Sequence, residues 1–256
     1  MSLYIKNCDE IIGKADYHYE FYSRYLKNER DIIVWLPPSY EHGEKSYPVL
    51  YLQDGQNMFN PQTAFTGYDW KIDETATELI NADEIEEFIA VGVYNSKDRL
   101  EEYNWFNPKG KNYCSFLINE LKPFIDETYR TKSGKFNNSV LGSSLGGLIS
   151  FQLVWNYSKV FGKGACLSNS FWVDDKEVFK MINNDDEQLK DIEIYIDCGT
   201  GETQLIEDNE RMVNLLQSLG YEYDNRLMYY FPEGAKHTEF DWAERVHLPL
   251  KFLFGK

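Results

Sequence analysis

The sequence predicts one α/β domain, residues 1–256, with a mostly parallel central sheet and helices on both of its faces. Short apolar runs of strand length alternate with segments of helical spacing, which is the pattern of a parallel sheet with crossover helices. Several runs, such as residues 48–53, are continuously apolar, as strands buried on both faces are. A chain of 256 residues suffices for one large core, and no linker or internal repeat divides it.

The predicted strands are apolar or alternating runs that end at turn-forming residues. They cover residues 16–23, 31–36, 48–53, 88–93, a run ending at 141, 164–168, 192–198 and 225–231. The first two are expected to form an antiparallel entry to the sheet. Helical spacing predicts helices over residues 69–80, 113–129, 148–154, 175–182, 207–219 and 240–254. Pro123 lies inside the second of these helices, so we expect a kink or a break there.

Charge and composition exclude several classes of partner. The chain has 26 basic and 42 acidic residues, a net charge of −16, and no stripe of Lys or Arg, so nucleic acid and anionic membrane surfaces are disfavoured. A small-molecule substrate is therefore expected. The first ten residues lack the basic and apolar parts of a signal peptide, and no apolar run reaches eighteen residues. A cytoplasmic location is the simplest expectation.

The four cysteines, Cys8, Cys114, Cys166 and Cys198, lie far apart in the sequence. Their spacing fits neither a disulfide framework nor a zinc site. We expect them to behave as small hydrophobic residues, and the sequence indicates no metal or cofactor.

The segment Gly142-Ser143-Ser144-Leu145-Gly146 has the G-x-S-x-G pattern of a nucleophile elbow. An apolar strand precedes it and a segment with helical spacing follows, which is the context that this motif requires. The serine at its centre must stand on a strained turn, where a Cβ at Gly142 or Gly146 would collide with neighbouring backbone. Ser144 is the predicted nucleophile.

A nucleophilic serine needs an imidazole within hydrogen-bond reach and a carboxylate that orients the imidazole. His18, His42 and His247 are interpreted as surface or packing residues. His237 instead follows the last predicted strand in a Gly-containing loop, after the serine, and the chain order serine, acid, histidine is that of α/β-hydrolases. The acid is expected at the corner from Asp197 to Glu202, the only carboxylate-bearing turn directly after a core strand in that interval.

Two further loops carry site candidates. Residues 54–57 follow a buried strand, where a loop can supply a backbone N–H to substrate, although an ordinary turn is the alternative. Residues 94–108 form a long polar and aromatic segment that we expect over a pocket; the alternative is a packed loop whose Tyr103 and Trp105 fill the core. Trp172 is expected to wall an acyl pocket or to be a core tryptophan.

Six segments together resemble the bacterial "putative esterase" family of the α/β-hydrolase superfamily, the group of esterase D, enterochelin esterases and feruloyl esterases. The segments are residues 37–40, 52–59, 98–103, 142–147, 198–202 and 237–242, and the resemblance runs from about residue 30 to residue 254. It implies that Ser144 is the nucleophile, His237 the base and Glu202 the acid. It also implies an oxyanion hole formed by the N–H groups of Gln56 and Leu145. The glutamate stands where many relatives have aspartate.

The position of the two carboxylates separates the candidates for the acid. In the strand over residues 192–198, Asp197 points to the same face as Glu193 and Tyr195 and lies inside the end of the ladder. Glu202 stands beyond a Gly-containing bend and is free to reach an imidazole, whereas Asp208 is placed to stabilise a helix N-terminus. The sequence therefore favours Glu202 as the acid and predicts a structural role for Asp197.

The sequence is read as a serine carboxylesterase that acts through an acyl-enzyme, without metal or cofactor. Its candidate substrate-binding residues are Asn57, Arg99, Tyr103 and Trp172. Three alternatives remain: an acyltransferase with the same triad, a peptidase, or a non-catalytic ligand-binding module on the same scaffold. The acyl group and the alcohol are not indicated, and siderophore lactones, hydroxycinnamoyl or acetyl sugar esters and thioesters all agree with the resemblance.

Overall fold

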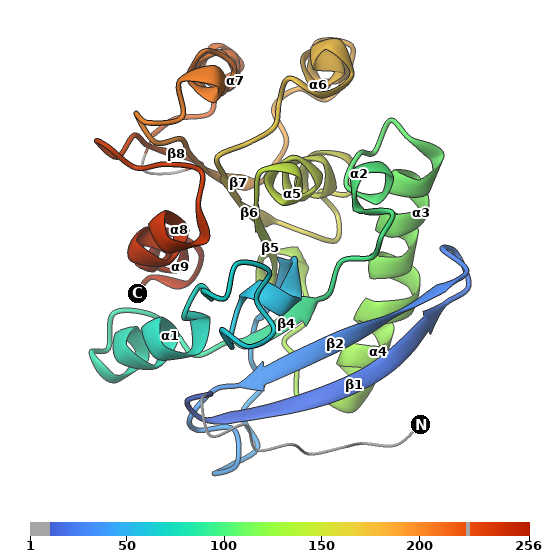
Figure 1. The fold of residues 1–256 in the computed structure, drawn as a ribbon, viewed down its shortest axis with the longest axis vertical. Coiled ribbons are helices and arrows are strands. Elements are labelled where there is room, and N and C mark those ends of the chain that lie inside the picture. The colour runs from blue at the N-terminus through green and yellow to red at the C-terminus, as the bar shows by residue number, and fades with distance from the viewer. Residues whose placement is uncertain (1–10, 224–225) are drawn as a thin grey trace.

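A twisted sheet of eight strands runs through the part of the chain that the computed structural model describes, residues 11–223 and 226–256 (Figure 1). The order across the sheet is β1-β2-β4-β3-β5-β6-β7-β8. The strands are β1 (Lys14–Ser23), β2 (Asn28–Leu36), β3 (Val49–Gln53), β4 (Ile89–Val93), β5 (Asn138–Ser143), β6 (Lys163–Leu167), β7 (Glu193–Asp197) and β8 (Leu227–Tyr230). Strands β1 and β2 are antiparallel to their neighbours, and the other pairs are parallel, so the predicted fold class and the antiparallel entry are confirmed.

Helices cover both faces of the sheet. They are α1 (Ile72–Asn81), α2 (Arg99–Glu102), α3 (Pro108–Phe116), α4 (Lys122–Thr128), α5 (Leu145–Asn156), α6 (Val173–Asn183), α7 (Thr203–Ser218), α8 (Glu239–Arg245) and α9 (His247–Phe254), with short 3₁₀ turns at Gly55–Asn57 and Lys135–Asn137. Alternate residues of β3 enter two separate cores: Tyr51 belongs to the core to which α3, α5 and α7 contribute, and Leu52 to the core to which α1, α8 and α9 contribute. Because β3 is buried on both faces, its sequence is apolar from Val49 to Leu52, and only Gln53 at its end is polar.

The predicted helix over residues 113–129 is longer and is divided. It begins at Pro108, where the side chain of Asn107 caps it, and it passes through a π-helical turn, Leu117–Leu121, before α4. Within this turn the N–H of Lys122 reaches the carbonyl of Leu117, five residues back. The wide turn accommodates Pro123, which has no N–H to donate and whose ring would clash in a regular helix.

The predicted single closing helix over residues 240–254 is wrong in one respect. The structure has two helices, α8 and α9, which meet at Val246. Pro249 explains the break, because a proline is tolerated in the first turn of a helix but cannot bond the carbonyl of Arg245 four residues before it.

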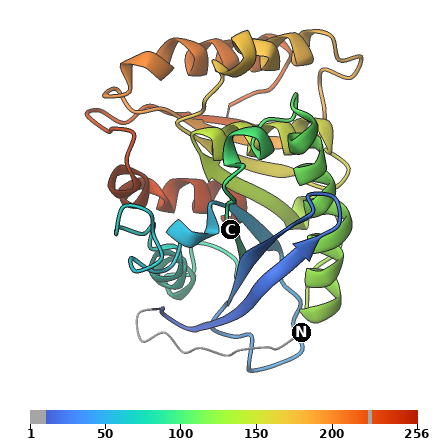
Figure 2. The same ribbon diagram turned by 45° about the vertical axis from the view of Figure 1, so that its right-hand side comes forward.

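The hairpin of β1 and β2 forms one end of the molecule, and α6 and α7 lie at the other (Figures 1 and 2). Among the described residues, no helix is both long and apolar enough to cross a membrane. Cys114, Cys166 and Cys198 are buried free thiols, as expected, whereas Cys8 lies outside the described residues.

The sheet register brings distant loops to one edge. Ser143 pairs with Leu167, and Leu167 pairs with Asp197, so the residues after β5, β6 and β7 leave the sheet at the same level. On the other side of β5, Gln53 pairs with Val93, which aligns the loops after β3 and β4. The carboxyl edge of the sheet therefore gathers all of the predicted site loops.

Candidate active site

The loop between β5 and α5 has the geometry of a nucleophile elbow. Ser144 has φ 58° and ψ −122°, a conformation that a non-glycine residue rarely adopts. Gly142 is required there, because a Cβ on it would lie 2.5 Å from the carbonyl oxygen of Gly146. The Ser144 hydroxyl is 3.3 Å from that of Ser170, whose N–H also donates to the Ser144 carbonyl. The strained turn thus projects one hydroxyl at the carboxyl edge of the sheet.

His237 and Glu202 are direct partners. The Nδ1 atom of His237 lies 2.6 Å from Oε1 of Glu202, whose side chain is 0% exposed. The other carboxylate oxygen accepts the Gly199 N–H at 2.6 Å and the Ser168 hydroxyl at 2.8 Å. Burial acts to raise the pKa of Glu202, but the hydrogen bonds from His237, Gly199 and Ser168 outweigh it and hold that pKa below its usual value. Glu202 is therefore a carboxylate at neutral pH.

The competing carboxylates lie elsewhere. Asp197 forms a bidentate ion pair with Arg245, with both N···O distances 3.0 Å. Asp208 pairs with Lys176 at 2.6 Å. The structure therefore brings Glu202, and neither of the two aspartates, to His237.

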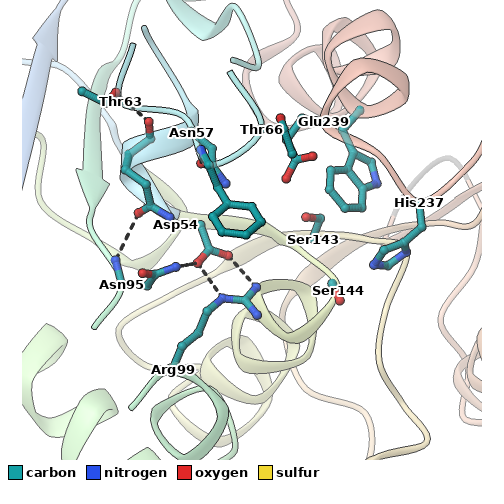
Figure 3. Close-up of a pocket in the computed structure, with 13 residues that line it drawn as sticks. Asp54, Asn57, Thr63, Thr66, Asn95, Arg99, Ser143, Ser144, His237 and Glu239 are labelled. Atoms are coloured by element: carbon teal, nitrogen blue, oxygen red, sulfur yellow. Dashed lines mark hydrogen bonds and ion pairs between the residues drawn. The ribbon is translucent and has the colours of Figure 1, made fainter. Parts of the chain in front are cut away.

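Ser144 and His237 both line a cavity of about 540 Å³ (Figure 3). The indole of Trp242 forms part of the same wall and meets the imidazole edge to face, with ring centroids 4.8 Å apart. This contact fixes the plane of the imidazole while its Nδ1 side is held by Glu202. His237 can then use its other nitrogen at the cavity.

The loop after β3 forms the opposite wall. Gln56 lies in the 3₁₀ turn, where Thr63 Oγ1 donates to its carbonyl at 2.7 Å and the Asn95 N–H donates to its side chain at 3.2 Å. Leu145 is the first residue of α5, so its N–H has no acceptor within the helix. Both predicted oxyanion donors thus belong to segments that are fixed before any ligand arrives.

Arg99 lies beside this loop as part of an ion pair. Its Nε and Nη2 atoms donate to the two carboxylate oxygens of Asp54, both at 2.7 Å, and Asn95 Nδ2 donates to Oδ1 at 2.6 Å (Figure 3). Hydrogen bonding to Asp54 outweighs the effect of burial and raises the pKa of Arg99. The guanidinium is therefore charged, and its charge is balanced locally.

The four candidate substrate-binding residues divide into two pairs. Asn57 and Arg99 line the cavity. Tyr103 does not line the cavity. It is fully buried, and its hydroxyl accepts a hydrogen bond from the N–H of Asp54, so it holds the loop after β3 in place. Trp172 is 54% exposed and is not part of the cavity wall, so neither the acyl-pocket nor the core interpretation describes it.

Sequence reasoning missed several residues of the site. Trp242 and Glu239 line the cavity and lie in the segment 237–242, which contributes to the family resemblance but implies no role for either residue. Phe65 also lines the cavity and is largely exposed at its rim. Ser168 and Arg245 contact the buried carboxylates, and no local sequence signal marks either of them.

A strained serine elbow at the carboxyl edge of a mostly parallel sheet defines an α/β-hydrolase. The chain belongs to the esterase family described as "Putative esterase", whose model matches residues 23–248.

Individual proteins are also similar to this chain. The chain is 29% identical over 245 residues to "Uncharacterized protein YjcH" of Bacillus subtilis (strain 168), covering 91% of this chain and 94% of that one. A solved structure titled "ferulic acid esterase" superposes with a TM-score of 0.76 at 21% identity, covering 94% of this chain and 97% of the other. The enterobactin esterase FES from Shigella flexneri superposes with a TM-score of 0.77 at 16% identity, covering 95% of this chain and 59% of the other.

Proposed function

We propose that the protein is a serine carboxylesterase that hydrolyses small esters through an acyl-enzyme. One observation carries the proposal: Ser144 stands on a strained elbow in the same cavity as His237, and the Nδ1 atom of His237 is 2.6 Å from the buried carboxylate of Glu202. Serine is a weak nucleophile on its own, and this arrangement supplies the base and the group that orients the base.

In the first half of the reaction, the imidazole takes the proton of Ser144 as the hydroxyl oxygen attacks the ester carbonyl carbon. The C–O bond to the alcohol then breaks, and the imidazolium returns its proton to the leaving alcohol. In the second half, a water molecule gives a proton to His237 and attacks the acyl carbon. The bond between that carbon and Ser144 Oγ then breaks, His237 returns the proton to Ser144, and the carboxylic acid leaves. The carboxylate of Glu202 keeps the Nδ1 atom protonated and stabilises the imidazolium in both halves.

The N–H groups of Gln56 and Leu145 are the proposed donors to the oxyanion. Donors fixed in advance stabilise the charge that develops in the transition state, and the loss of one such donor typically costs about 2.7–4 kcal/mol. The hydrogen bonds from Thr63 and Asn95 to Gln56 support this assignment, because they hold the turn without a ligand.

The cavity favours neutral esters. Its arginine is already paired with Asp54, and Glu239 adds a carboxylate to the wall. The names of two similar structures, a ferulic acid esterase and an enterobactin esterase, make ferulic acid esters and enterobactin the first natural substrates to test.

The test compares neighbouring serines. Ser144→Ala is expected to abolish p-nitrophenyl acetate hydrolysis and labelling by a fluorophosphonate probe, because only the central serine of the motif projects from the elbow. Ser143→Ala is the matched control and is expected to keep most of both signals. Products are analysed with and without an acceptor alcohol, since acyl transfer would use the same residues. Labelling that persists in the Ser144 variant would refute the assignment.

A further inference from the structure

The triad acid lies in a buried polar group that we call the acid-side cluster: Ser168, Asp197, Glu202 and Arg245. Its members come from four segments, namely the ends of β6 and β7, the residue before α7, and α8. All four are at least nine-tenths buried. Their contacts span up to 77 positions of sequence, so only the folded chain assembles the cluster.

The hydroxyl of Ser168 has only one possible orientation. Trp242 Nε1 donates to it at 2.9 Å and Arg245 Nη2 donates to it at 3.0 Å, and neither of these groups can accept a hydrogen bond. A serine hydroxyl has two lone pairs and one proton, so both lone pairs are occupied. The single proton is left for the Glu202 oxygen 2.8 Å away. This bond is formed only when that oxygen is an acceptor, as in the ionised carboxylate.

Arg245 supplies the charge that makes this arrangement stable. Its Nε and Nη2 atoms hold Asp197, its Nη1 atom donates to the carbonyl of Asp241 at 3.0 Å, and Nη2 lies 4.0 Å from Glu202 Oε2. One guanidinium thus faces two buried carboxylates. Buried charges without a partner are strongly unfavourable, so the arginine offsets part of the cost of keeping Glu202 ionised.

The same contacts fix the histidine loop. Arg245 and Trp242 both belong to α8, the helix that follows His237, and both bind the hydroxyl of Ser168. The indole of Trp242 also packs against the imidazole. The cluster therefore fixes the position of Glu202, the acid, relative to His237, the base.

We propose that Ser168 and Arg245 are positioning residues, which fix Glu202 as an ionised acceptor for His237. The role in turnover rests on the proposed esterase function. The titratable groups that face Glu202 are His237, Arg245, Asp197 and Cys198, and burial raises the pKa of the last two.

The test is Ser168→Gly. Ser168 has φ 47°, a left-handed conformation that glycine adopts without strain, so this variant removes the hydroxyl and leaves the backbone unstrained. We expect kcat for p-nitrophenyl acetate to fall about tenfold with little change in KM, because one orienting hydrogen bond is lost. We also expect Glu202 to titrate at higher pH, measured by the ¹³C shift of its carboxyl carbon and assigned with Glu202→Gln. The control is Ser139→Ala, a buried serine at the far end of β5 whose hydroxyl has no partner among the described residues.

The carboxyl titration needs no turnover, so it tests the positioning role even for a protein without esterase activity. A Ser168→Gly variant with wild-type kcat and wild-type Glu202 titration, changed only in thermal stability, would show that Ser168 is purely structural. For a Ser168 variant that does not fold, Arg245→Lys takes its place: it keeps the charge but lacks the planar fork with which Arg245 binds both oxygens of Asp197 and the Ser168 hydroxyl at once. It is expected to shift the Glu202 titration in the same direction, and an unchanged titration would overturn the proposal.

Discussion

Two arginine–carboxylate pairs stand on opposite sides of Ser144, and they differ mainly in burial. Arg245 and Asp197, in the acid-side cluster, have side chains that are 5% and 0% exposed. Arg99 and Asp54, beside the loop of Gln56, are 28% and 8% exposed, and both line the cavity. Each pair is bidentate, so geometry alone does not separate them.

The difference in burial teaches what each pair can do. A fully buried pair has lost its hydration, so every polar atom must be matched within the protein and the whole group is rigid. Such a pair can hold a neighbouring buried acid, here Glu202, in one position. A pair that remains open to a cavity keeps part of its hydration and can contact a ligand without the loss of a buried partner. The Arg99 pair is therefore expected to tolerate change better.

The largest expected effect distinguishes the two carboxylates of the acid-side cluster, Glu202 and Asp197. Glu202→Gln should lower kcat by roughly 10²–10⁴ with folding intact, because the imidazole loses the carboxylate that selects its tautomer. Asp197→Asn should cost mainly stability, since Asp197 contacts Arg245 and does not contact His237. Steady-state kinetics and thermal unfolding of both variants decide the matter. Near-wild-type kcat in Glu202→Gln, with activity lost in a folded Asp197→Asn, would assign the acid to position 197.

The second prediction breaks each ion pair by removing its arginine. Arg245→Met should lower the free energy of unfolding by about 3–5 kcal/mol, because Asp197 is left buried without a cation. Arg99→Met should lower it by about 1 kcal/mol, because Asp54 keeps Asn95 as a donor and is open to the cavity. Urea denaturation measures both values. Equal losses of stability in the two variants would show that burial does not distinguish the pairs.

Another buried carboxylate, Asp73 in α1, sharpens the comparison, because Asp73 takes part in none of the ion pairs among the described residues. Burial, followed by the neighbouring Glu74, raises its pKa to about 8. The folded chain then keeps a proton that the unfolded chain releases, so this group makes stability fall as pH rises from about 4 to about 8. Asp73→Asn should remove that pH dependence. The free energy of unfolding of the variant, relative to that of the wild type, should therefore rise by at least about 1 kcal/mol between pH 5 and pH 8. Unfolding curves that keep the same difference between variant and wild type at both pH values would contradict the shift.

The smallest expected effect concerns the charge of the substrate. A chain of charge −16 whose cavity arginine is already paired should hydrolyse neutral short-chain or aromatic esters several-fold better than strongly anionic ones at low salt. The difference should shrink as salt screens the field. Ratios of kcat/KM for matched neutral and anionic esters at two ionic strengths measure it. A several-fold preference for an anionic ester at low salt would refute this prediction.

The sequence by itself determined the features that depend only on residues close to one another in the chain. The continuous apolar run of β3 predicted a strand buried on both faces, and the glycines around Ser144 predicted a turn at which backbones approach closely. The bend after β7 separated Glu202 from Asp197, because side chains alternate along a strand and only a residue beyond its end is free to turn. Each of these inferences depends on neighbours within a few residues.

Only the tertiary structure decided which side chains serve the site from a distance. Ser168 meets Trp242 and Arg245 of α8, which lie 74 and 77 positions later in the sequence, and nothing in their own neighbourhoods marks that contact. Tyr103 and Trp172 had two interpretations each, because an aromatic residue in a loop gives the same sequence signal whether it is buried, as Tyr103 is, exposed, as Trp172 is, or facing a ligand. The physical reason is that periodicity and turn chemistry are short-range, whereas burial and hydrogen-bond partners depend on how the loops come together at the sheet edge.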